Sequence, residues 1–471
     1  MRTSTTLAVA ATIIGANAIN LVKRTDGSAP RVVQHEIQRR HVENPVQRDQ
    51  ARMRRRSNTV NVRLDNEETL YFMNLTIGTP AQDLRLHIDT GSSDLWVNVP
   101  GSQMCLATGD PCEASGTYTA NSSSTYQYLN GEFNITYVDG TGSSGDYVSD
   151  VVAFGGITMQ DQQFGIGYIS SSEEGVLGIG YPLNEVAVAY NGGVPYNNVP
   201  KYMVAHDLIN VNAYSLWLND LDASTGAILF GGVNTDKYTG TLQSVPVIQE
   251  EGVYAEFIIA LTAVGANGTS GSLAKNIAYP ALLDSGSSLM YLPDDITTQI
   301  YDSVGAQYDS TQGAAFVDCD LANSGGTIDF TFSSPTISVA MNELVIVAGT
   351  EKGEDICILG ISPAGDSTPV LGDTFLRSAY VVYDISNNEI GLASTNFNST
   401  SNNIMEITAS GIPDATVVTG AVTSVAVDAS GARNVDQPTG LTSSAYAMPT
   451  AAVGYNVALL GAVGAGLAFA M

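Results

Sequence analysis

Cysteine and histidine are scarce in this sequence of 471 residues. There are four cysteines, none of them in a C-x-x-C pair, and only His87 and His206 follow residue 56. A zinc site or a histidine-dependent nucleophilic triad would need a richer supply of these residues. We therefore expect neither a bound metal nor another cofactor.

The four cysteines are an even number, which favours disulfide bonds in an exported chain. Sequence alone permits three pairings. The short span from Cys105 to Cys112 suggests a small closed loop, which would leave Cys319 with Cys357.

Basic residues are also scarce beyond residue 56. The chain from Ser57 onward has 8 Lys and Arg against 43 Asp and Glu, a formal charge of −35, so it is a poor partner for nucleic acid. The other 11 basic residues lie in residues 1–56 and include Lys23-Arg24, Arg39-Arg40 and the run RMRRR that ends at Arg56. A basic block can be a nucleic-acid or membrane arm. We interpret residues 19–56 instead as a cationic propeptide, removed by a dibasic-site protease or by self-cleavage.

Neither end of the chain has an apolar run as long as the about 20 residues of a membrane helix. The run Leu7–Gly15 followed by Ala16-Asn17-Ala18 predicts a secretory signal peptide at residues 1–18, rather than a buried strand. The uncharged end from Val457 predicts a GPI-attachment signal at residues 444–471, with Ser443 or Ser444 as the attachment residue. A frayed tail or a single-pass anchor is the alternative.

The body from Thr59 to about Ser394 has short runs rich in Val, Ile, Tyr, Thr and Phe between turn residues, which predicts a mostly-β fold. Residues 396–443 are rich in Ser, Thr and Ala, and we interpret them as an extended, O-glycosylated stalk. Five N-x-S/T sequons are possible glycosylation sites in an exported protein: Asn74, Asn121, Asn134, Asn267 and Asn398.

One unusual stretch occurs twice, and internal similarity of this kind indicates a repeated structural unit. LHIDTGSSDLWV at residues 86–97 returns as ALLDSGSSLMYL at residues 281–292. Each copy is followed later by an apolar-apolar-glycine unit, at residues 176–178 and 370–372. A single D-T-G-S would suggest only an Asx turn. The doubled set instead predicts two equivalent loops that bring Asp89 and Asp284 together.

Two carboxylates at close range cannot both ionise comfortably, so the pair retains one proton over an acidic range. One carboxyl can then take a proton from a water that attacks an amide, while the other protonates the emerging oxyanion. The neighbouring residues suit this chemistry. Gly91 and Gly286 allow tight turns, and the hydroxyls of Thr90 and Ser285 can cross-link the two loops. Ser92 and Ser287 can donate hydrogen bonds to the outer carboxylate oxygens.

With these motifs the chain resembles the pepsin-like aspartic endopeptidases over Thr59–Ser394, especially the fungal secreted branch that includes yapsins and candidapepsins. The resemblance implies a bilobal fold with a pseudo-two-fold axis and a central cleft, with lobes at residues 57–243 and 244–395. It implies that Asp89 and Asp284 are catalytic, and it favours the disulfides Cys105–Cys112 and Cys319–Cys357. The segment LGDTFLRSAYVVYD at residues 371–384 matches the family's second-lobe signature.

The resemblance also identifies ITYVDGT at residues 135–141 as the hairpin flap over the substrate. Tyr137 would be the flap tyrosine, hydrogen-bonded to Trp96, with Asp139, Gly140 and Thr141 beside the peptide. Val138 departs from the family, which often has glycine at that position. A carboxylate at Asp139 could select Lys or Arg in the substrate, although Asp139 could instead only cap the hairpin turn.

We therefore expect a monomeric aspartic endopeptidase, made as a zymogen and active on peptides and proteins at acidic pH. The two end signals predict passage through the secretory pathway to a GPI anchor at the plasma membrane or cell wall, with partial secretion as the alternative. Two other functional classes stay open: a catalytically silent pepsin-like binding module and a structural wall protein. Intact residues around both aspartates argue against the former, and a wall protein would not need the doubled loop.

Overall fold

The computed structural model describes residues 20–22, 29–40, 70–137, 142–190, 193–223, 225–250, 252–365 and 367–425. The predicted signal peptide, most of the predicted propeptide, and the GPI signal with Ser443 and Ser444 lie outside these residues. So do the flap positions Val138, Asp139, Gly140 and Thr141. Within the described ranges the fold is mostly β, as the sequence predicts. No helix in these ranges is long and apolar enough to cross a membrane.

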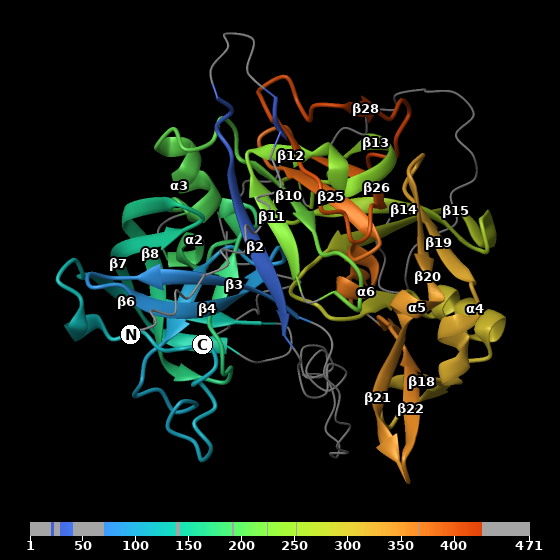
Figure 1. Cartoon of the computed structure of the whole chain (residues 1–471), viewed down its shortest axis with the longest axis horizontal. Helices are drawn as coiled ribbons and strands as arrows, with labels where there is room; N and C mark the ends of the chain where they lie inside the picture. The colour runs from blue at the N-terminus through green and yellow to red at the C-terminus, as the bar shows by residue number, and fades with distance from the viewer. Residues whose placement is uncertain are drawn as a thin grey trace, which may run out of the picture.

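The first lobe is built from seven neighbouring strands in the order β3-β4-β9-β5-β8-β7-β6. Strands β3, β4, β6, β7 and β8 of this lobe are labelled in Figure 1. Turn-rich segments separate runs of apolar and β-branched residues, and the buried side chains of these strands form the core. The strands are β3 (Leu70–Ile77), β4 (Gln82–Asp89), β5 (Leu95–Asn98), β6 (Gln127–Thr136), β7 (Gly142–Phe154), β8 (Ile157–Ser170) and β9 (Val176–Gly178). Two helices, α2 (Val186–Tyr190) and α3 (Val199–Ala205), accompany this lobe, and Asn198 caps the start of α3 by accepting from the backbone N–H of Lys201.

The second lobe repeats the motif in a seven-stranded sheet with the order β20-β19-β14-β15-β24-β16-β23. Its strands are β14 (Ile258–Ala266), β15 (Thr269–Leu283), β16 (Met290–Leu292), β19 (Thr327–Thr331), β20 (Thr336–Ala340), β23 (Ile361–Pro363) and β24 (Val370–Leu371). A four-stranded sheet adjoins it, with β17 (Gln307–Asp309), β18 (Ala314–Val317), β21 (Val345–Glu351) and β22 (Glu354–Leu359). The helices are α4 (Asp294–Val304), α5 (Met341–Leu344) and α6 (Asp373–Leu376).

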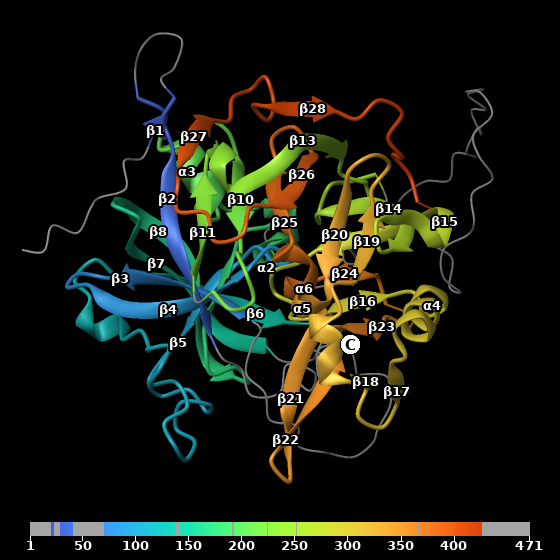
Figure 2. The same ribbon diagram turned by 45° about the vertical axis from the view of Figure 1, so that its right-hand side comes forward.

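Strands between the lobes continue the first-lobe sheet, so that fourteen strands form one hydrogen-bonded series (Figures 1 and 2). They are β2 (Val33–Arg40), β10 (Ala213–Trp217), β11 (Thr225–Phe230), β13 (Tyr238–Pro246), β25 (Ala379–Asp384), β26 (Glu389–Thr395) and β28 (Ala415–Val417). Strand β2 belongs to the predicted propeptide, yet it lies between β11 and β3. Gln38 pairs with both Thr225 and Phe72, and Ile37 is fully buried.

The stalk prediction for residues 396–443 is wrong for residues 396–425, which pack on the body. Strand β27 (Asn403–Glu406) pairs with β12 (Gly232–Asn234) and with β1 (Asn20–Leu21). Ile404, Ile407 and Ile412 are 2%, 0% and 8% exposed. The average composition of the segment is rich in Ser and Thr, so it gave no indication that these three isoleucines are buried. Burying their apolar side chains favours packing of the segment on the body, despite the polar residues around them.

Candidate active site

The two aspartate loops are joined by reciprocal hydrogen bonds across the lobe boundary. Thr90 Oγ1 donates to the Leu283 carbonyl at 2.9 Å, and Ser285 Oγ donates to the Ile88 carbonyl at 3.0 Å. The backbone N–H of each residue donates to the other's hydroxyl oxygen, at 3.2 Å from Thr90 and 2.9 Å from Ser285. All these groups are buried. The two loops therefore form one rigid unit, which holds the aspartates in a defined relative position.

Each aspartate also accepts two hydrogen bonds from its own loop. The donors are the backbone N–H of the glycine two residues later and the hydroxyl of the serine three residues later. The distances are 2.8 and 2.5 Å at Asp89, from Gly91 and Ser92, and 2.7 and 2.7 Å at Asp284, from Gly286 and Ser287. These paired donors give the two carboxyl groups the same local orientation.

The carboxyl groups lie against the opposite loops. A Cβ atom on Gly91 would lie 2.6 Å from Oδ1 of Asp284, and one on Gly286 would collide with Oδ1 of Asp89. Asp89 and Asp284 are only 2% and 6% exposed. Only glycine fits at either position, since any side chain would displace the carboxylate of the other lobe.

The apolar-apolar-glycine units at residues 176–178 and 370–372 form strands that pair with the strands leading into the two aspartate loops. Strand β9 runs parallel to β4 and places Gly178 opposite Asp89, while β24 runs parallel to β15 in the second lobe. Asp89 accepts from the N–H of Ile179 at its backbone carbonyl, at 2.9 Å, and the N–H of Asp284 donates to the Leu371 carbonyl at 3.2 Å. The repeated pattern in the sequence thus corresponds to a repeated strand pair that positions each aspartate.

Tyr137 lies at the end of the predicted flap strand and is packed inward. The Nε1 of Trp96 donates to its hydroxyl at 2.7 Å, and Tyr137 is 4% exposed. Phe133, Ile135 and Tyr147 complete the apolar cluster around the pair. The end of β6 is therefore connected to β5, which directly follows the Asp89 loop.

A buried acidic network beside this cluster was not predicted from the sequence. Asp94 is fully buried and accepts from the hydroxyls of Tyr147 and Tyr196, at 2.6 and 3.1 Å, and from the backbone N–H of Val186 at 2.8 Å. Burial raises the pKa of Asp94. Glu185 accepts from the Tyr196 N–H at 2.7 Å, and burial, together with the charge of Asp94, raises the pKa of Glu185 to about 10. The only sequence signal was an acidic residue inside the repeated stretch, where Asp94 stands at the position of Leu289 in the second copy.

The structure also describes the predicted disulfides and the sequon asparagines. Disulfides join Cys105 to Cys112 and Cys319 to Cys357, with S–S distances of 2.01 and 2.04 Å. All five sequon asparagines are exposed. In the described part of the chain, no group of three His, Cys, Asp or Glu residues is arranged to hold a metal ion.

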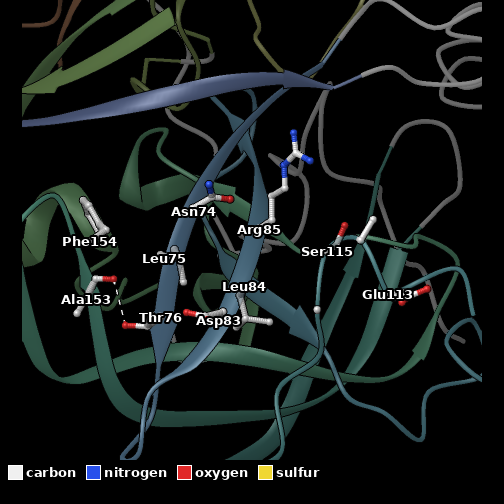
Figure 3. Close-up of a pocket in the computed structure, with 12 residues that line it drawn as sticks. Asn74, Leu75, Thr76, Asp83, Leu84, Arg85, Glu113, Ser115, Ala153 and Phe154 are labelled. Atoms are coloured by element: carbon white, nitrogen blue, oxygen red, sulfur yellow. Dashed lines mark hydrogen bonds between the residues drawn. The ribbon is translucent and has the colours of Figure 1, made fainter. Parts of the chain in front are cut away.

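A cavity of about 580 Å³ opens in the first lobe between β3, β4 and the loop that follows Cys112 (Figure 3). Its lining includes the sequon residue Asn74, the acidic Asp83 and Glu113, and Arg85. Neither Asp89, Asp284 nor Tyr137 contributes to it. This cavity is therefore separate from the paired aspartates.

Comparisons with known proteins agree with this geometry. The family model for eukaryotic aspartyl protease matches residues 70–395. A probable aspartic-type endopeptidase opsB of Aspergillus oryzae is 55% identical over 435 residues, which cover 90% of this chain and 88% of that one. A secreted aspartic protease 3 of Candida albicans is 40% identical over 355 residues, covering 73% and 84%. The crystal structure of an aspartic proteinase from Irpex lacteus matches this chain with a TM-score of 0.60 at 21% sequence identity. The match covers 79% of this chain and all of that one, and it shows that the two proteins share a fold. The chain therefore belongs to the eukaryotic aspartyl protease family and is an aspartic-type endopeptidase.

Proposed function

We propose that Asp89 and Asp284 carry out the peptide-bond hydrolysis. The observation that supports this is the placement of two buried carboxylates, each against the other's glycine and each with the same two donors. The pair shares one proton and binds a water molecule between its oxygens. One carboxyl takes a proton from this water as it attacks the substrate carbonyl, and the other stabilises and protonates the oxyanion.

We propose that the enzyme works at acidic pH. The mechanism requires one protonated carboxyl, which two adjacent carboxylates retain only in the acidic range. The raised pKa values of Glu185 and Asp94 support the same working range, because the stability that a raised carboxyl pKa contributes is fully present at acidic pH and is lost as the pH rises.

Tyr137 is the proposed flap residue that closes over the bound peptide, with Asp139, Gly140 and Thr141 beyond it contacting the substrate. A preference for Lys or Arg next to the cleaved bond is supported by charge. Between Arg85 and Lys201 the chain has no Lys or Arg, so this stretch, which contains the proposed flap, has few positive charges to repel a basic substrate side chain. Asp139 is the proposed partner of that side chain.

The chain is further proposed to be a secreted zymogen that is anchored by GPI at the cell surface, in the manner of yapsins. The N-terminal signal, the basic residues up to Arg56 and the apolar C-terminus support this, as does the secreted relative from Candida albicans. The exposed sequon asparagines are compatible with glycosylation during export.

The test is cleavage of a mixed peptide library by the processed enzyme from pH 3 to pH 7, with and without pepstatin. Cleavage at acidic pH that pepstatin blocks and that Asp284→Asn abolishes would support the proposed dyad. An enrichment of Lys or Arg at the cut sites, lost selectively in Asp139→Ala, would support the specificity. A folded enzyme that cuts nothing in this range would favour the silent binding module, and activity in Asp284→Asn would contradict the dyad.

A further inference from the structure

Three tyrosines form an exposed patch on strands β6, β7 and β8, which lie at one end of the fourteen-stranded sheet. Tyr128 on β6 and Tyr168 on β8 are 59% and 46% exposed, and Tyr126, just before β6, is half-buried. The peptidase chemistry uses none of them. A group of large exposed side chains in one place is typical of an interaction site, whereas scattered ones need no explanation.

Asp146 on β7 joins the tyrosines into one cluster. Its Oδ2 accepts from the Tyr168 hydroxyl at 2.7 Å, which fixes the direction of that ring. Burial raises the pKa of Tyr126, and the charges of Asp146 and Tyr128 add to the rise, so both groups lie near Tyr126. Tyr126 and Tyr128 likewise add to the raised pKa of Tyr168, after burial and Asp146. The four side chains therefore lie together on this face of the sheet.

A small open space lies between the carboxylate and one of the rings. Gly131 on β6 is exposed, and a Cβ atom added to it would lie 3.5 Å from Oδ1 of Asp146 and 3.6 Å from the hydroxyl oxygen of Tyr128. A cationic donor placed there would be close to two oxygens that can accept from it. An ammonium or guanidinium over a tyrosine ring also gains a cation–π attraction. The cluster thus has the chemistry to hold a Lys or Arg side chain.

The charge around the patch is complementary to a basic partner. Strands β6, β7 and β8 contain four acidic residues and no Lys or Arg. Of these, Glu132 and Asp161 are exposed, like the patch itself. No side chain on these three strands therefore repels a cationic segment, and the nearby carboxylates attract one.

The patch also lies along the strands that lead to the proposed flap. Strands β6 and β7 pair antiparallel up to Thr136 and Gly142, and Asp146 follows Gly142 by four residues. At about 3.3 Å per residue of a strand, Asp146 is about 13 Å along β7 from that end. An extended polypeptide covers this distance in about four residues. A protein substrate bound in the active site is therefore long enough to reach the patch as well.

We propose that Tyr126, Tyr128, Tyr168 and Asp146 form an exosite that binds a Lys- or Arg-rich segment of a protein substrate, several residues from the cleaved bond. The cationic side chains of this segment lie over the tyrosine rings and against Asp146. This deepens the proposed preference for basic substrates and rests on that proposed function, but it does not depend on Asp139.

The test compares two forms of one quenched fluorogenic peptide whose cleavable core has no Lys or Arg. One form has a flexible spacer and a tail of six D-lysines, which keep the charge and resist cleavage, and the other has six D-glutamines instead. Each tail is placed at either end of the core in turn. The processed wild-type enzyme should have a KM roughly two- to fivefold lower for the D-lysine form, the effect of a cation–π contact at an exposed site, with an unchanged kcat.

Three variants show whether the patch causes this preference. Tyr128→Ser, Tyr168→Ser and Asp146→Asn should each raise the KM of the D-lysine form toward that of the D-glutamine form. All three should cut the D-glutamine form as wild type does, which also shows that they fold. Tyr308→Ser is the matched control, because Tyr308 is a 41% exposed tyrosine on β17 in the second lobe. It should keep the preference.

Loss of the preference in the three patch variants and not in Tyr308→Ser supports the exosite. A preference that survives in them would come from the overall negative charge of the enzyme and would overturn the proposal, as would equal KM values for both forms in wild type. Competition by a neutral soluble glucan, rather than by free hexa-D-lysine, would indicate a carbohydrate site and would also overturn it. The proposed Lys or Arg preference at the cut site is measured separately with the peptide library, so the two failures are distinguishable.

Discussion

Gly286 shows how closely the two lobes approach at the site. A methyl group at this position would meet Oδ1 of Asp89 and would lie 2.9 Å from Oδ1 of Asp284. We expect Gly286→Ala to lower kcat at least about 100-fold, because a shift of about 1 Å in a reacting group has an effect of this size. Peptide cleavage and pepstatin affinity would both fall.

The matched control is Gly101→Ala, because Gly101 has open space around its Cβ position and an ordinary backbone conformation. This variant should keep wild-type activity. Near-normal turnover by Gly286→Ala would show that the loops adjust freely and would contradict the tight approach of the carboxylates.

The hydrogen bond from Trp96 to Tyr137 connects the end of β6, the proposed flap arm, to the strand that follows the Asp89 loop. We expect Trp96→Phe and Tyr137→Phe each to lower kcat/KM, and the double variant to be little worse than the poorer single one. The expected coupling energy is about 1 kcal/mol, the net value of a typical buried hydrogen bond. A double-mutant cycle on kcat/KM measures it, and strictly additive losses would show that the bond does not contribute to turnover.

At the scale of elements, two buried acidic side chains bond the backbone around α2: Asp94, next to β5, and Glu185, next to the start of α2. The N–H of Val186 donates to Asp94 and the N–H of Tyr196 donates to Glu185. The pKa of Glu185 is about 10 in the fold, against 4.5 as its ordinary value. Its stabilising contribution is therefore fully present below about pH 4.5 and is lost as the pH rises through this window, by up to about 1.4 kcal/mol per pH unit.

Glu185→Gln removes this titration while keeping an oxygen that can accept from Tyr196. The variant should match wild type at pH 4 and resist denaturant better than wild type at pH 7. Unfolding curves at both pH values measure the difference, with the exposed Glu132→Gln as control. An equal loss of stability between pH 4 and pH 7 in wild type and Glu185→Gln would mean that Glu185 does not titrate as described.

Strands around the repeated motif were predictable from the sequence, whereas two other elements were not. The motif is an apolar run followed by an Asp, a hydroxyl residue and a glycine. The apolar run predicts a strand and the following residues predict a turn, so both can be predicted without knowing which distant strands pair with them. Strand β2 and strand β27 instead form because distant strands offer them hydrogen-bond partners, β11 and β3 for the former and β12 for the latter. Local pattern carries no information about those partners. The same limit concealed the contact of His87 with Ser285 across 198 positions of the chain.

At the scale of the whole molecule, the C-terminal segment of residues 399–425 is part of the fold, although the family match ends at residue 395. It crosses the body and pairs with β12 and β13 through β27 and β28. The N–H of Val422 then donates to Ser333 Oγ at 3.0 Å. The segment therefore fastens strands of the central sheet to the second lobe.

Truncation separates this structural segment from the tether proposed beyond it. A chain that ends after Val425 keeps the buried Ile404, Ile407 and Ile412, so it should unfold at the same temperature as the longer protein. A chain that ends after Asn398 no longer buries these three isoleucines and no longer pairs β27 and β28 with the body, so it should be less stable than the longer chains. Its melting temperature should be lower, by about 1 °C for each kcal/mol of stability lost in a chain of about 400 residues. Equal melting temperatures for the two truncations would mean that the segment packs on the body without stabilising it.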